Sequence, residues 1–188
     1  MLNSVVALFN AGAAPAAAGD YESIATTTIS TDTANVTFSS IPSIYNHLQL
    51  RIIARSDRAA NFDTMRFELN GDTGSNYSYH SLYGDGSAAG AAAVTSASSM
   101  SFDRLVGNNA SANTFGTLII DLLDYTNTNK YKTARNLGGG DNNGSGEIYF
   151  QSGLWQSTSA VTQIKVFPGV GTNFKQYSHF ALYGIKGA

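Results

Sequence analysis

Alternation of apolar and polar positions is the main pattern of the chain after residue 20. It is clearest at residues 47–55, where polar or charged residues mostly separate an inward set made of Leu48, Leu50, Ile52 and Ala54. Residues 115–125 are more apolar. Leu118, Ile120 and Leu122 share one face there, and Ile119 and Leu123 lie on the other. Since side chains alternate faces along a strand, both segments are predicted to be β-strands.

Similar runs recur along the chain, and turns rich in Gly, Asn, Asp and Ser separate them about every 8–12 residues. The predicted strands cover residues 21–30, 35–39, 47–55, 65–69, 77–83, 100–106, 115–125, 131–137, 147–155, 161–167 and 176–186. In the strand at 147–155 we expect Ile148, Phe150, Ser152 and Leu154 to face inward. Residues 84–99 and 138–146 are predicted to be loops. The pattern predicts an all-β fold, an antiparallel β-sandwich or jelly roll of about ten strands.

The last predicted strand, residues 176–186, is apolar on both faces. One face suits a packed core and carries Ser178, Phe180, Leu182 and Gly184. The other is also too apolar for water and carries Tyr177, His179, Ala181, Tyr183 and Ile185. Such a strand is either buried within its own domain or packed against another copy. We expect Tyr177, Tyr183 and Ile185 to contribute to a contact between copies.

Residues 1–20 form a separate segment. Leu2, Val5, Val6 and Phe9 recur at helical spacing, and a linker of small residues follows at 11–19. A signal peptide is an alternative reading, but the segment lacks the basic region that such peptides carry. We expect an arm that docks on a partner, and we favour another subunit over the chain's own domain. The chain thus divides into an arm, 1–20, and a sandwich domain, 21–188.

Composition narrows the classes of partner. Charged residues make up 13% of the chain and the net charge is −2, against a usual charged share of roughly 25%. No cluster of Lys and Arg is present, so a nucleic-acid partner is not expected. There is no cysteine, hence no disulfide or thiolate metal site. No apolar run reaches the roughly 18 residues of a membrane-spanning helix, so no membrane partner is expected.

Residues that could carry catalysis do not form a recognisable motif. His47, His80 and His179 lie in three different predicted strands, and none belongs to a metal-binding pattern. Asp121 and Asp124 are a close carboxylate pair, but a spacing of three puts them on opposite faces of a strand, where they cannot address one glycosidic bond. We therefore expect no catalytic site, no cofactor and no metal, and a protein that is not an enzyme.

Two loops have a spacing of oxygen ligands that resembles part of a calcium loop. The first offers Asp141, Asn143, Ser145 and Glu147, but it lacks the later bidentate Glu. The second, with Asn70, Asp72 and Asn76, is weaker. Turns that need a positive φ have this composition in any case, so the sequence leaves calcium binding open.

Sugar binding would use exposed aromatic rings with Asn or Asp nearby. Trp155 and Tyr149, on one face of a predicted strand end, are the main candidates, and Tyr77 and Tyr79 are the others. The alternative is that these rings pack against protein.

Several stretches together resemble a family of small virion structural proteins of tailed bacteriophages, frequent in phages of cyanobacteria and other aquatic bacteria. They are YESIAT at 21–26, FSSIPS at 38–43, HLQLR at 47–51, NGDTGSNY at 70–77, LLDY-x-NTNK at 122–130, SGLW at 152–155 and ALYGIKG at 181–187. The resemblance runs over nearly the whole chain and implies a structural component of the particle. It supplies no catalytic residues.

From this resemblance we expect a non-enzymatic protein at the surface of the virion. The first reading is a capsid decoration or cement protein, a homotrimer whose arm (Leu2, Val5, Val6 and Phe9) binds the major capsid protein or another virion protein. Three arms in one oligomer would bind tightly together even if each were weak. The alternative is a tail-associated fibre or knob that binds a host-surface glycan through Tyr149 and Trp155. A secreted carbohydrate-binding module is a third, more distant reading.

Overall fold

The computed structural model describes residues 19–187, which form twelve strands in two antiparallel sheets. The all-β sandwich expected from the sequence is confirmed. The large sheet contains, in spatial order, β1 (Tyr21–Thr28), β12 (His179–Ile185), β3 (His47–Ala54), β8 (Gly116–Leu123), β9 (Lys132–Asp141), β10 (Gly146–Trp155), β5 (Tyr77–Gly84) and β6 (Ala89–Ala97). The small sheet contains β2 (Val36–Phe38), β11 (Ile164–Pro168), β4 (Phe62–Leu69) and β7 (Met100–Val106).

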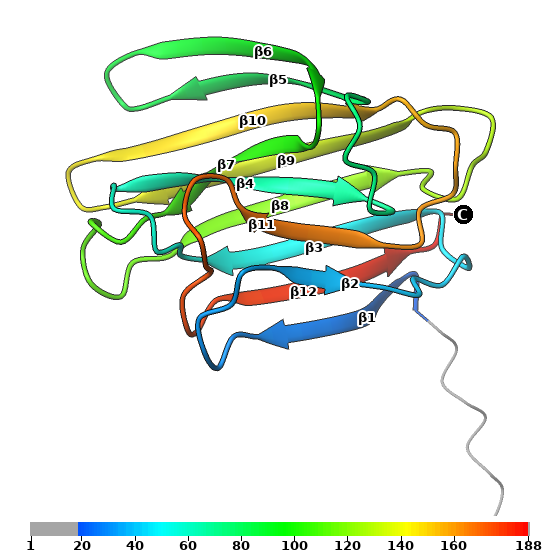
Figure 1. Cartoon of the computed structure of the whole chain (residues 1–188), viewed down its shortest axis with the longest axis horizontal. Helices are drawn as coiled ribbons and strands as arrows, with labels where there is room; N and C mark the ends of the chain where they lie inside the picture. Colours follow the sequence, from blue (N-terminus) through cyan, green and yellow to red (C-terminus); the bar gives the residue numbers. More distant parts are fainter. Residues whose placement is uncertain (1–18, 188) are drawn as a thin grey trace, which may run out of the picture.

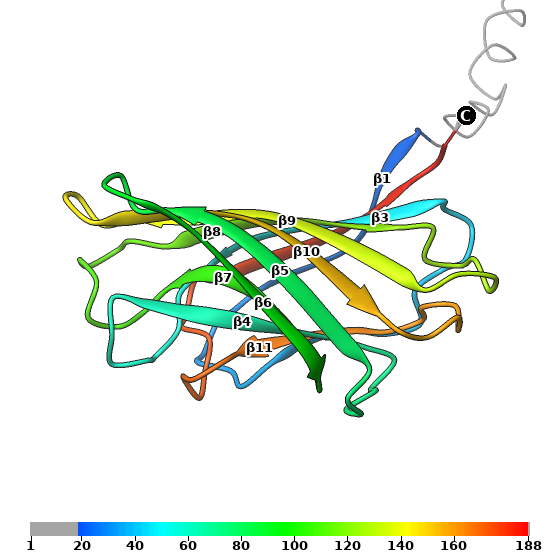
Figure 2. The same cartoon turned by 90° about the horizontal axis from the view of Figure 1, so that it is seen from above.

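The two sheets lie one over the other as two layers (Figures 1 and 2). Eight strands, β1, β2, β3, β4, β7, β8, β11 and β12, alternate between the sheets in chain order, except that β4 and β7 both lie in the small sheet. The β5–β6 hairpin and the β9–β10 pair are insertions in this alternation, and both extend the large sheet. The large sheet is therefore twice as wide as the small one, and its face away from the small sheet is left uncovered by the described chain.

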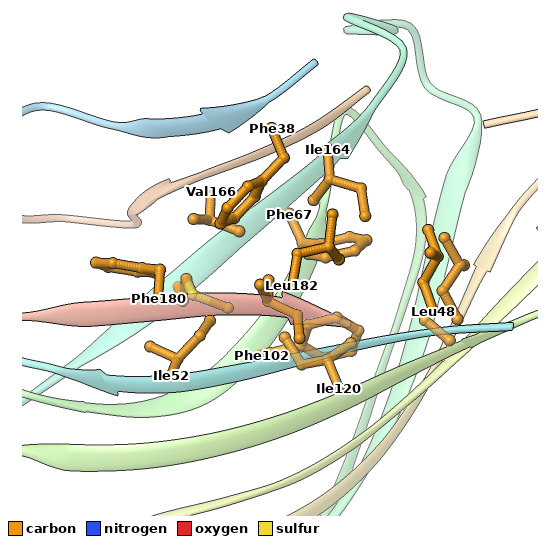
Figure 3. Close-up of a cluster of buried hydrophobic side chains, with 14 of the residues drawn as sticks. Phe38, Leu48, Ile52, Phe67, Phe102, Ile120, Ile164, Val166, Phe180 and Leu182 are labelled. Carbon is orange, nitrogen blue, oxygen red and sulfur yellow. The ribbon is translucent and has the colours of Figure 1, made fainter. Parts of the chain in front are cut away.

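The core lies between the two sheets. In Figure 3, Ile52, Leu182 and Ile120 of the large sheet point toward Phe67 and Val166 of the small one. The rings of Phe67 and Phe102 meet edge to face with centroids 5.5 Å apart. Truncating a buried Leu or Ile here to Ala is expected to cost about 2–5 kcal/mol. This interface is where most of the folding free energy is gained.

The inward faces predicted for two strands agree with the structure. Leu48, Leu50, Ile52 and Ala54 of β3 are buried, and so are Phe180, Leu182 and Gly184 of β12. A Cβ atom at Gly184 would lie 2.3 Å from the ring of Tyr45, because this ring packs directly on the glycine. Strand β12 begins at His179, three residues later than predicted, and Tyr177 precedes it with a φ of 72°.

Strand β10 has the opposite orientation to the one predicted from its apolar residues. Tyr149, Gln151 and Trp155 face the small sheet and are buried, whereas Ile148 and Phe150 are exposed on the outer face. The reason is the polar interior at this point. Gln151 satisfies its amide inside the sandwich, and Gly153 leaves room for Met100, whose Sδ would lie 2.5 Å from a Cβ there. The predicted inward set therefore forms part of an outer surface.

Both predicted Gly-rich loops contain strand structure. Residues 84–99 include β6, which pairs with β5 along most of its length. Tyr83 lies over Gly90 so closely that a Cβ there would be 2.5 Å from its ring, which explains the small residue. Residues 138–146 include the end of β9 and a turn at Asn143 and Gly144, both with positive φ. Both segments form strand because they pair with a neighbouring strand, and local composition does not reveal such pairing.

Three buried charges hold the loops at the ends of the sandwich. Arg55 donates four hydrogen bonds to loop carbonyls at residues 108–114. Lys132 is fully buried and donates to the carbonyls of residues 127, 130 and 158. The carboxylate of Asp63 accepts from the amides of residues 64, 170 and 171. Each charge meets several backbone groups, which compensates for its burial.

The arm with Leu2, Val5, Val6 and Phe9 lies outside the described residues, so its docking role stays a prediction. The described chain begins next to β1, at one edge of the large sheet (Figure 1).

Candidate functional site

The outer face of the large sheet carries a straight row of exposed apolar side chains. Pairing places Ile119 of β8 beside Leu137 of β9, Leu137 beside Phe150 of β10, and Phe150 beside Leu82 of β5. Their exposed fractions are 41%, 51%, 53% and 58%. We call these four residues the apolar row. Ala91 of β6 continues the row at one end, and Arg51 of β3 adjoins it at the other.

A polar row runs beside the apolar row, two residues further along each strand. It consists of Gln49, Asp121, Arg135, Ser152 and His80, again in direct cross-strand register. Gln49 donates a 2.8 Å hydrogen bond from Nε2 to Asp121. The guanidinium of Arg135 makes no hydrogen bond and no ion pair within residues 19–187. The outer face thus combines an apolar band with adjacent unlike charges.

Two shallow hollows interrupt this face. One, of about 870 Å³, is lined by Phe115, Thr117, Ile119, Leu137 and Ile148 together with glycines of β9, β10 and the adjoining turns. It forms because Gly139 places no side chain between Thr117 and Ile148. The other, of about 540 Å³, lies over β5, β6 and β10 between Leu82 and Phe150. Both are open and mainly apolar, so they suit a contact with a protein surface better than an enclosed small molecule.

Carboxylates at the rim of the larger hollow are already engaged in their own turns. Asp85 accepts hydrogen bonds from the amides of Ser87 and Ala88, which lower its pKa to about 2. Asp141 accepts from the amide of Asn143. Glu147 accepts from Nε of Arg104 at 2.5 Å.

The second loop considered for calcium is likewise occupied by its own contacts. Asp72 accepts from the amide of Gly74, from Asn76 and from Trp155, and Asn70 binds the backbone at residues 160–163. In the part of the chain that the structure describes, no three His, Asp or Glu side chains gather as metal ligands would. The turn geometry accounts for both Asn/Gly-rich compositions.

The three residues predicted to contact another copy fall in different settings. Tyr183 of β12 stacks on Tyr21 with ring centroids 4.8 Å apart, and the guanidinium of Arg51 lies over both rings. Ile185 is partly exposed at the end of the same strand. Tyr177 is 70% exposed in the turn before β12. Tyr183 and Ile185 lie on the outer face, beyond one end of the polar row, whereas Tyr177 lies outside the strand.

The two aromatic residues considered for sugar binding are buried, which corrects that interpretation. Trp155 is 3% exposed, stacks on Tyr77, and donates from Nε1 to Asp72 at 2.7 Å. Tyr149 is 6% exposed and stacks on Tyr83 under the guanidinium of Arg104. Burial raises the pKa of the Tyr149 hydroxyl. Both rings pack against protein, as the alternative reading held, and neither offers a face to a glycan.

A polar cluster lies inside the sandwich under β10. The amide of Gln151 accepts hydrogen bonds from the backbone of Asp103 and from Asn136, and donates to Ser81 and to the Asp103 carboxylate. Burial raises the pKa of Asp103, against the lowering effect of Arg104. The members come from β5, β7, β9 and β10, so the cluster ties the inserted strands to the small sheet. None of its groups reaches the outer face.

Comparison of the chain with known protein families, with curated proteins and with solved structures finds no match. Across residues 19–187 there is no helix long and apolar enough to cross a membrane.

Sequence reasoning missed the apolar row. The pattern puts Ile119 on the face opposite Leu118 without deciding which face points outward. It predicts that Phe150 faces inward, and it does not single out Leu137 or Leu82. A signal that could have revealed part of the row lies in β10, where Tyr149 and Trp155 share the buried face with Gln151 and Gly153, opposite Ile148 and Phe150.

Proposed function

We propose that this protein is a non-enzymatic structural component of a bacteriophage particle, and that it decorates the capsid surface. The observation that carries the proposal is the uncovered outer face, which presents apolar side chains in a contiguous row. Monomeric proteins rarely expose large contiguous apolar patches, and such patches mark interaction surfaces. A decoration protein that oligomerises through its sandwich needs a surface of this kind.

The strand order adds support. We infer that β1, β2, β3, β4, β7, β8, β11 and β12 form a jelly roll, with the β5–β6 and β9–β10 strands as insertions that widen one sheet. Jelly rolls occur in viral capsid and lectin domains. Since one fold hosts many functions, this likeness supports the proposal only together with the phage-like sequence stretches.

The predicted arm gives the proposal a testable mode of attachment. Residues 1–20 would bind the major capsid protein or another virion protein, and the sandwich would form homo-oligomers at the particle surface. An arm adds contact area, although ordering it on binding costs entropy.

The attachment is tested by mixing purified protein with phage particles that lack it and pelleting the particles. The full chain is expected to co-sediment, and a chain lacking residues 1–20 is expected to remain in the supernatant with its sandwich folded. If both chains co-sediment with the particles, the proposed role of the arm is wrong. If neither chain co-sediments, the proposed function is wrong.

A tail-associated protein that binds a host glycan remains the second candidate. With Tyr149 and Trp155 buried, the feature that favours it is the larger hollow, where Phe115 lies near the turns that carry Asp85 and Asp141. Phe115→Ala would then abolish glycan binding, whereas it would leave capsid decoration unchanged.

A further inference from the structure

We propose that two copies of this chain pack face to face through the outer faces of their large sheets, around a two-fold axis that runs along the strands between β8 and β9. The inference does not depend on the phage assignment. It rests on the cross-strand register of the outer face, on its charges and on its shape.

The position of the axis follows from the sheet. The order β1-β12-β3-β8-β9-β10-β5-β6 has four strands on each side of the β8–β9 junction. A two-fold axis at the junction places β8 of one copy over β9 of the other and β3 over β10. The whole face is then buried, which no axis nearer an edge would achieve. Sheets pack in this way about 10 Å apart, with strand directions within about 30°.

The apolar row is self-complementary about this axis. Ile119 and Leu137 are direct neighbours on either side of the junction. In the pair, Ile119 of each copy lies over Leu137 of the other. Further from the axis, β3 of one copy lies over β10 of the other, which brings Arg51 into register with Phe150. The apolar band of one copy thus covers the apolar band of its mate.

The charges match in the same arrangement. Asp121 and Arg135 are also direct neighbours across the junction. The two-fold operation therefore puts Asp121 of each copy over Arg135 of the other, so two unlike pairs form. Such complementarity fixes the register of a contact and rejects shifted ones. Arg135, which lacks a side-chain partner within residues 19–187, would gain one.

The shape of the face matches as well. Thr117 of β8 is the direct neighbour of Gly139 of β9, where the larger hollow lies. The axis brings Thr117 of one copy over Gly139 of the other, so a side chain meets a position without one. An isologous contact of this kind closes as a dimer and does not propagate.

The first test measures the mass of the full-length chain by analytical ultracentrifugation over a range of concentrations. A concentration-dependent dimer is expected. Leu137→Glu should weaken it by on the order of a hundredfold, because a charge would enter the apolar row. Val170→Glu is the matched control, since Val170 is 64% exposed in the loop between β11 and β12, away from this face, and should leave the dimer intact.

The second test uses the charges. In the proposed dimer, position 121 of each copy faces position 135 of the other. Asp121→Arg therefore creates two Arg–Arg pairs, and Arg135→Asp creates two Asp–Asp pairs. Each variant alone should be monomeric, with an unchanged circular dichroism spectrum. An equimolar mixture of the two variants should form a heterodimer, and the double variant should form a homodimer again.

Several results would overturn the inference. They are a wild-type chain that stays monomeric at every soluble concentration, a trimer mass, or a mixture of the two charge variants that does not associate. A dimer in solution with no copies in phage particles would leave this inference standing and refute the proposed function. A monomer that is abundant in particles would do the reverse.

Discussion

Replacement of Arg55 by Lys should destabilise the sandwich although the charge is kept. Arg55 is 8% exposed, and the two terminal nitrogens of its guanidinium donate to the carbonyls of residues 108, 110, 111 and 114 at 2.7–3.2 Å. All four acceptors are neutral and lie in the loop between β7 and β8. The planar guanidinium spreads its donors over this loop, whereas an ammonium is a compact group that cannot reach both sides.

The magnitude follows from the hydrogen bonds lost. A hydrogen bond to a charged group contributes about 1.5–3 kcal/mol, and Lys is expected to keep about two of the four. Because the bonds share one loop, their contributions do not add fully. We expect Arg55→Lys to lower the free energy of unfolding by about 3 kcal/mol, and therefore the melting temperature by about 6–12 °C for a chain of this size.

The assay is chemical denaturation followed by circular dichroism at one fixed protein concentration, so that self-association does not change between samples. Arg66→Lys is the control, because Arg66 is partly buried in β4 and its side chain makes no hydrogen bond within residues 19–187. The control should change stability by less than about 0.5 kcal/mol. An Arg55→Lys variant as stable as this control would refute the reasoning, since it would mean that water satisfies the loop carbonyls.

Three further predictions concern buried groups. Lys132→Met should lower the free energy of unfolding by about 2–4 kcal/mol, because three carbonyls lose a charged donor; thermal unfolding checks it, and an unchanged melting temperature would contradict it. Burial raises the pKa of Asp103, so its ionised form costs stability that is relieved as pH falls through that raised pKa. Asp103→Asn should therefore gain stability relative to wild type as pH rises from about 4 to 7, and a pH-independent difference would argue against it. The hydrogen bond from Trp155 lowers the pKa of Asp72, so the stability that this carboxylate contributes persists above its ordinary pKa and is lost below it. Since Trp155 is the one tryptophan of the sequence, its fluorescence in the folded protein should change with a midpoint below about pH 3.9, and Asp72→Asn should remove that change.

The strands that the sequence predicts correctly are those whose two faces differ in polarity. The clearest case is β3, where the inward residues are apolar and polar residues mostly separate them, so alternation alone indicates the buried face. The opposite holds for β10. Its buried face carries Gln151 and Gly153, and its exposed face carries Ile148 and Phe150. The pattern of polarity predicted the wrong buried face for β10, because the partners of Gln151, in β5, β7 and β9, are far from it in sequence.

The apolar row could not be predicted for a related reason. Its members, from Leu82 to Phe150, are distributed over four strands, and they become neighbours only through the order β8-β9-β10-β5. That order depends on the β5–β6 and β9–β10 insertions, which extend the large sheet beyond β8. The small residues of β6 likewise look like a loop until the pairing with β5 is known. Strand order, and not local pattern, determines the candidate site.

The outer face of the large sheet is the part of the molecule that most needs a partner. An exposed apolar row costs solubility unless a partner covers it, and the adjoining Asp121 and Arg135 would give that contact its register. A dimer formed there leaves the small sheet free for other contacts.

Capsid decoration is decided by the copy number of this protein in purified phage particles, measured by quantitative mass spectrometry against the major capsid protein. We expect a ratio to the capsid protein of the order of one, as a decoration protein requires. A protein present at a small fraction of the capsid protein would belong to the tail and would contradict capsid decoration. Absence from the particles would contradict a structural role in the virion altogether.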